Sequence, residues 1–169
     1  MIRTFLGPLA ALTLALTAAP AFAGAAENAF LASLVGNYIG KATVPDQNGR
    51  PSPVSCRLVV AGSTPGKITY SGRCSIAAGS MSMTGAVTFN GGKYLAAMSS
   101  SGGMSGNSVG VKRGNAVSFS SNGHDTMGGG NRDVSSTLTL SPGGMRVEFV
   151  IKDNKTGKTT RGSIPFAKA

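Results

Sequence analysis

The stretch VSCRLVVAGSTPGKITYSGRC, residues 54–74, has the pattern of two β-strands joined by a tight turn at residues 64–66. Apolar and polar residues alternate on both sides of the turn, as in strands with one buried face. A turn at this place sets Cys56 opposite Cys74, close to the Cβ distance that a disulfide needs. The stretch therefore predicts a hairpin closed by a Cys56–Cys74 bridge, with Leu58 opposite Gly72 and Val60 opposite Tyr70.

The same alternation continues on both sides of this hairpin, in short runs separated by Gly, Asn, Pro and Ser. It predicts ten strands, at residues 37–44, 54–61, 67–78, 81–89, 93–99, 106–112, 116–121, 134–141, 145–152 and 160–166. A helix is expected only at 25–35, where Phe30, Leu31 and Leu34 share one face.

Three further turns set the expected strand registers. Asn90-Gly91 is a strong hairpin signal, and similar turns are expected at 113–115 and 142–144. The expected pairs are Val87–Tyr94, Gly85–Ala96 and Met83–Met98, then Val111–Val117 and Val109–Phe119, and last Leu138 and Leu140 against Val147, Phe149 and Ile151.

Sequential hairpins with one apolar face each predict an all-β fold, an antiparallel up-and-down barrel of about 8–10 strands with a short N-terminal helix. A β-sandwich is the alternative. The outward positions are polar, whereas a barrel that crosses a membrane needs apolar residues there. We therefore do not expect the domain to span a membrane.

The first 23 residues resemble a cleavable signal peptide. Arg3 precedes an apolar run over residues 6–19, and Ala21-Phe22-Ala23 has the pattern of a cleavage site. Residues 24–169 then form a single β-barrel domain. Export, together with an even number of cysteines, predicts a periplasmic or secreted protein of a Gram-negative bacterium with one disulfide.

The formal net charge of the chain is +10. Outside the cytoplasm such a charge indicates an anionic envelope surface as partner, not nucleic acid, or serves solubility alone. The basic-surface candidates are Lys41, Arg57, Arg73 and Arg113.

The barrel interior offers the other candidate site. Its aromatic candidates for ligand binding are Tyr38, Tyr70, Tyr94, Phe89, Phe119 and Phe149. Several inward positions are small, namely Gly40, Ala42, Gly72, Gly85 and Ala96. Small residues there either leave a ligand cavity or mark bends of the wall.

Catalytic and metal chemistry has little support in the sequence. His124, the only histidine, and Asp125 could form a base with its orienting acid, but they fall in an expected Gly-rich loop. Met81, Met83 and Met98 form a weak soft-metal candidate, and core packing is the favoured explanation for them. We expect no enzyme activity, no cofactor and no bound metal.

The segment Leu34-Val-Gly-Asn-Tyr-Ile-Gly-Lys-Ala42 resembles the start of lipocalin-like barrels, in which a short helix leads into Gly-x-aromatic-x-Gly. The order of features along the chain is similar to that of small exported alphaproteobacterial proteins without an assigned function. The resemblance implies a periplasmic calycin-like barrel and no activity.

These observations predict a non-enzymatic binding protein for a small apolar or amphipathic ligand. The alternatives are a structural or interaction protein of the cell envelope that uses its basic surface, and an enzyme built around His124 and Asp125.

Overall fold

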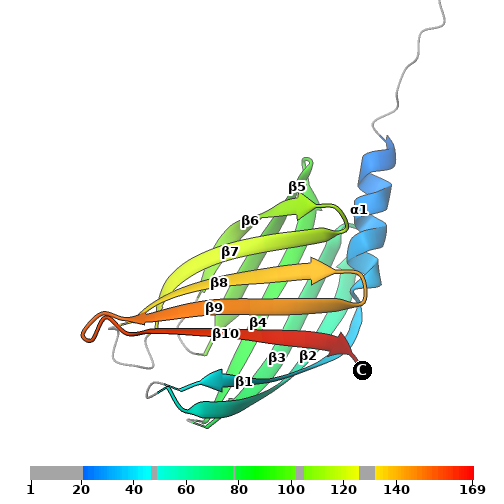
Figure 1. Ribbon diagram of the computed structural model, residues 1–169. Coiled ribbons are helices and arrows are strands. Elements are labelled where there is room, and N and C mark those ends of the chain that lie inside the picture. Colours follow the sequence, from blue (N-terminus) through cyan, green and yellow to red (C-terminus); the bar gives the residue numbers. More distant parts are fainter. Residues whose placement is uncertain (1–20, 47–48, 78, 102–104, 126–131) are drawn as a thin grey trace, which may run out of the picture.

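The computed structural model describes residues 21–46, 49–77, 79–101, 105–125 and 132–169. One helix precedes ten strands in this part of the chain (Figure 1). The elements are α1 (Ala21–Ser33), β1 (Gly36–Pro45), β2 (Pro51–Thr64), β3 (Lys67–Ile76), β4 (Gly79–Asn90), β5 (Lys93–Ser100), β6 (Ser105–Arg113), β7 (Ala116–Asp125), β8 (Arg132–Ser141), β9 (Gly144–Asp153) and β10 (Thr159–Lys168).

The strands form one closed antiparallel barrel in which every strand pairs with its neighbours along the chain, and β1 pairs with β10. This confirms the expected up-and-down barrel, so the sandwich alternative is wrong. Short turns make this order possible, and glycines with positive φ occupy several of them, for example Gly66 and Gly143.

The register of the first hairpin is as predicted. Cys56 pairs with Cys74 across β2 and β3, and the two form a disulfide. The next hairpin differs by two residues, because its two-residue turn is Gly91-Gly92 and not Asn90-Gly91. Both glycines have positive φ, as a type I′ turn requires. The observed pairs are Val87–Ala96, Gly85–Met98 and Met83–Ser100.

The β6–β7 register differs from the prediction by one residue. Arg113 pairs with Ala116, so the turn contains two residues and not three. A slip of one residue moves a strand's side chains to the other face. Val109 and Val111, expected inside, are therefore on the outside, where they are 59% and 55% exposed.

Two seams of the barrel are short. In the described residues, β1 pairs with β10 at three positions and β6 pairs with β7 at three positions, whereas the other ladders have six or more. Both seams lie at the mouth near α1, and Figure 1 shows β1 and β10 diverging away from it. The closed barrel is therefore joined at these two seams mainly near the helix.

The helix begins and ends earlier than the expected 25–35, and it packs against the barrel mouth that contains the β2–β3 turn (Figure 1). Leu31 and Leu34 are 1% and 0% exposed, and Phe30 packs against the same core. The predicted apolar face is thus the face that closes this mouth. We call this end of the barrel the helix-side half, and the other end the far half.

The expected signal peptide falls mainly on residues 1–20, which lie outside the described residues. Within the described part of the chain, no helix is long and apolar enough to cross a membrane.

Candidate functional site

The helix-side half of the interior is a filled core. Its inward side chains are almost fully buried, with exposures of 3% or less for Tyr38, Ile68, Val87, Tyr94, Val117, Phe119 and Leu140. Tyr94 packs edge-on against Phe30 of the helix, with ring centroids 5.9 Å apart. This half has the close packing of a protein core.

Polar contacts hold the helix in the mouth. The Glu27 carboxylate accepts hydrogen bonds from the Tyr94 hydroxyl and from Lys112 Nζ. The Tyr38 hydroxyl donates to the Leu34 carbonyl at 2.7 Å, and Lys168 Nζ donates to the Ser33 carbonyl at 3.2 Å. Tyr38 and Tyr94 therefore use their hydroxyls to anchor α1 and its C-terminal end.

Aromatic rings cover three of the inward glycines. A Cβ added at Gly85 or at Gly162 would clash with the ring of its directly paired partner, Tyr70 or Phe149. Gly40 is covered in the same way by Phe166. Of the two interpretations of the small inward residues, these positions therefore support a tightly packed wall, in which each missing side chain makes room for a ring.

The far half is more open. Inward side chains there are only partly buried, namely Val44, Ile76, Met81, Met83, Met98, Ser100, Ser121, Ser136, Phe149 and Ile151. The exceptions are Val54 and Val134 at 5% exposure each, Ser52 at 9%, and the disulfide, with Cys56 at 1% and Cys74 at 3%. A Cβ added at Gly106, an inward position of β6 by its pairing with Met98, would meet no described atom within 4 Å. We call this region, lined by the ten partly buried residues, the far lumen.

The far lumen combines apolar surface with hydroxyl groups. The Ser121 and Ser136 hydroxyls are hydrogen-bonded at 2.8 Å. The Ser100 Oγ is buried and has no hydrogen-bond partner among the described residues. At the rim, Arg132 pairs in register with Asp153, whose pKa is lowered mainly by the Thr156 amide hydrogen bond. An apolar molecule with one polar end matches this distribution.

The six aromatic candidates do not form one site. Tyr38, Tyr94 and Phe119 belong to the filled core, and Phe89 packs on Tyr94 with ring centroids 5.0 Å apart. Only Tyr70 and Phe149 are partly buried rings in the middle of the barrel; burial raises the pKa of Tyr70 to about 12.

The methionine candidates face the far lumen. Met81 pairs with Cys74 and Met98 pairs with Gly85, while Met83 packs against the core. Within the described residues, no group of three His, Cys, Asp or Glu side chains could hold a metal. The alternation of β4 and β5 identified the inward direction of these methionines, and their soft-metal role stays a prediction.

His124 and Asp125 do not lie in a loop as expected. They are the last residues of β7, and they pair with Asp133 and Arg132 of β8. Hydrogen bonding to β8 extends β7 beyond the predicted end at residue 121, despite the glycine in this segment. The rest of the expected loop, residues 126–131, lies outside the described residues.

The basic candidates separate into two places. Lys41, Arg57 and Arg73 lie on adjacent strands, exposed on the outer face of β1–β3. Arg113 lies at the helix-side end of β6, away from this trio.

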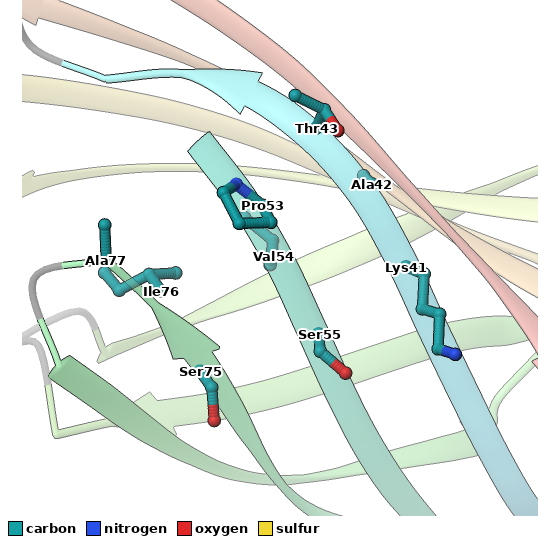
Figure 2. A pocket seen from close by; sticks show the side chains of 9 residues that line it. All are labelled: Lys41, Ala42, Thr43, Pro53, Val54, Ser55, Ser75, Ile76 and Ala77. Carbon is teal, nitrogen blue, oxygen red and sulfur yellow. The ribbon is translucent and has the colours of Figure 1, made fainter. Parts of the chain in front are cut away.

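Two outer grooves were not predicted, because a groove depends on the twist of the sheet and not on alternation. The first is about 620 Å³ and lies over the ends of β1–β3; Figure 2 shows Lys41, Ser55 and Ser75 among its lining residues. The second, of about 480 Å³, lies over β8–β10 and includes Glu148 and Arg161.

The chain matches no protein-family model and no curated protein in sequence. Among solved structures, Rv2717c from M. tuberculosis is similar, with a TM-score of 0.60 and 12% identity over 85% of this chain and 97% of that one. A de novo designed fluorescence-activating β-barrel has a TM-score of 0.43 and 15% identity over 82% and 96% of the two chains. The phycobiliprotein lyase CPES from Guillardia theta has 0.40 and 10% over 86% and 97%. At these identities the likeness to Rv2717c shows the barrel fold alone.

Proposed function

We propose that the protein is a non-enzymatic binding barrel that holds a small apolar or amphipathic ligand in the far lumen. The observation that supports this is the contrast between the two halves of the interior. Most inward side chains beside α1 are fully buried, whereas most of those in the far half are partly exposed although they are mostly apolar. Partly exposed apolar surface inside the barrel wall favours ligand binding because its burial releases water.

The ligand's chemistry follows from the lining. Met81, Met83 and Met98 offer flexible apolar surface that adapts to irregular shapes, and Ile151 adds a stiffer apolar side chain. The paired hydroxyls of Ser121 and Ser136 offer a few hydrogen bonds, which orient a ligand more than they add affinity. A ligand with an alkyl or aromatic body and a small polar end fits this lining best.

The proposed compartment is the periplasm or the extracellular space. The disulfide supports this proposal, because such bonds persist in oxidising compartments. The signal-peptide pattern of the first 23 residues supports it independently.

The test is titration with the apolar fluorescent probe N-phenyl-1-naphthylamine. The variant Ser136→Phe inserts a ring into the far lumen, whereas Ser135→Phe places the same ring on the exposed outer face of the same strand. Wild type and Ser135→Phe should enhance and blue-shift the probe's fluorescence equally, and Ser136→Phe should bind it about tenfold more weakly. Absence of binding to wild type, or equal weakening in both variants, would refute the proposal.

A further inference from the structure

Two arginines face each other on the outer wall of the barrel. Arg57 of β2 pairs directly with Arg73 of β3, next to the Cys56–Cys74 disulfide on the inner face. Neighbours of this kind have Cβ atoms ~4.5–5.5 Å apart. Because the disulfide joins the adjacent pair of residues, β2 and β3 cannot slip past each other, and the two guanidinium groups stay opposite.

A third cation lies beside this pair. Lys41 of β1 pairs with Ser55, two residues along β2 from Arg57 on the same outer face. All three side chains are exposed. We call Lys41, Arg57 and Arg73 the cation trio.

No acidic residue of this sheet compensates the trio. The sequence contains no Asp or Glu between Gln47 and His124, which includes all of β2–β6, and β1 contains none. Glu27 is engaged at the helix-side mouth with Tyr94 and Lys112. Like charges that face each other across a ladder are destabilising, so the trio costs stability when no anion is bound.

Hydroxyl groups surround the trio. Arg73 Nε donates to Ser80 Oγ at 3.1 Å, which orients that guanidinium along the outer face. Ser55 and Ser75 pair directly with each other on the same outer face, and together with Lys41 they line the groove shown in Figure 2. Guanidinium groups bind the oxygens of phosphate and sulfate in pairs, and hydroxyls complete such sites as donors.

We propose that the cation trio is a binding site for a tetrahedral oxyanion, a phosphate or sulfate group, on the outer face of β1–β3. The site is independent of the far lumen, which lies on the other side of the wall. Its ligand is either a free oxyanion or the phosphate of an anionic lipid headgroup, because both present the same oxygens to the arginines.

The first experiment measures melting temperature in inorganic phosphate against chloride at equal ionic strength. The test variant is Arg57→Gln/Arg73→Gln. The control is Arg146→Gln/Lys152→Gln, which removes the same charge from exposed positions of β9. Phosphate at saturating concentration should raise the melting temperature of wild type and control by about 2 °C or more, and that of the test variant should not change.

A second readout compares the like-charge pair with an isolated cation. In chloride at low ionic strength, Arg57→Gln should raise the melting temperature more than Arg146→Gln does, because it removes a like-charge pair as well as one unit of net charge. A phosphate response that is absent from wild type, or equal in test and control variants, would overturn the proposal, as would a melting temperature of Arg57→Gln in chloride that is no higher than that of Arg146→Gln.

Vesicles separate the two sources of the oxyanion. Vesicles of phosphatidylcholine with one fifth phosphatidylglycerol are compared with pure phosphatidylcholine in a flotation assay. Binding to the anionic vesicles that is lost in Arg57→Gln/Arg73→Gln but kept in the control assigns the site to a lipid headgroup. A phosphate response without vesicle binding assigns it to a free oxyanion.

Discussion

Some glycines of the inner wall are covered by a neighbouring aromatic ring, and others are not. Gly110 and Gly106, which lie on the same face of β6, show the two cases. A Cβ at Gly110 would come within 2.7 Å of Phe119 and Val117 atoms, whereas a Cβ at Gly106 would meet no described atom within 4 Å. The difference follows the division of the interior into a filled half and the far lumen.

We therefore predict that Gly110→Ala destabilises the protein by about 1–3 kcal/mol, the usual cost of overpacking. Gly106→Ala should change stability by less than about 1 kcal/mol, because the methyl group finds space and restricts the unfolded chain. Urea denaturation of both variants measures this. Equal losses would show that both ends of β6 are packed alike.

Because of Tyr70, we expect the stability of the folded protein to depend on pH in the alkaline range. Burial raises its pKa from 10.0 to about 12 in the folded protein, so the folded state favours the neutral phenol. The stability that this contributes is fully present below pH 10 and is lost as the pH rises from 10 to 12. Tyr70→Phe should lose less stability than wild type in that window, measured by denaturation in urea at both ends of it. An identical loss in the two proteins would contradict a buried phenol.

Residue types and alternation were enough to identify most inward side chains. The cysteine pair, Tyr38 and the inward methionines were found in this way. Val109 and Val111 were assigned to the wrong face, because the sequence Arg113-Gly114-Asn115 suits a three-residue turn as well as the observed two-residue turn. The choice between the two turns decides which face of the strand is inward. The rings over glycines could not be predicted, because each depends on the final register.

At the scale of elements, α1 closes one barrel mouth through an apolar face and one carboxylate. Glu27 is the only described residue that joins the helix to both β5 and β6 by polar contacts, through Tyr94 and Lys112. Its side chain is 13% exposed and that of Lys112 is 45% exposed, so solvent screens the ion pair with Lys112 more than it weakens the hydrogen bond from Tyr94.

Glu27→Gln should therefore destabilise the protein by about 1–3 kcal/mol, because it leaves Lys112 without its charged partner and weakens the Tyr94 hydrogen bond. Glu148→Gln, on the exposed face of β9, is the matched control and should change little. Calorimetry gives both values, and faster amide exchange in α1 should accompany the loss. Similar melting temperatures for the two variants would show that apolar packing alone holds the helix.

The elements themselves were predictable because turn residues and alternation are local signals. All ten strands appear where the pattern indicates them, and the main differences are at their ends, as in β7. The two-residue shift at Gly91-Gly92 arises because three residues, Asn90 to Gly92, suit a tight turn and only the φ angles show which two form it.

For the whole molecule, the disulfide is the strongest single constraint on unfolding. It closes a loop with a sequence separation of 18 residues, which is worth about 3 kcal/mol in the chain-entropy model. Cys56→Ala should lower the free energy of unfolding by this amount in urea denaturation. Wild type treated with dithiothreitol is the control and should match the variant. If Cys56→Ala unfolds like untreated wild type, the two sulfurs are not bridged in solution.

The barrel's closure could be predicted from its short sequential turns, but the division of its interior could not. Which inward side chains are covered depends on where α1 sits and on how far the two seams extend. The outer cation trio was named residue by residue from the sequence, yet its convergence on one face required the observed pairing of β1, β2 and β3.

The two short seams also bear on self-association. Among the described residues, β1, β6, β7 and β10 each have one edge that is paired at only three positions of a seam. The rest of that edge has no ladder partner, and unpaired strand edges can accept strands from other chains. Proline and charged residues interrupt two of these edges, with Lys41 and Pro45 on β1 and Arg161 and Pro165 on β10. On β1 and β10, the edges that the short seam leaves unpaired therefore carry residues that hinder edge-to-edge pairing between copies of the chain.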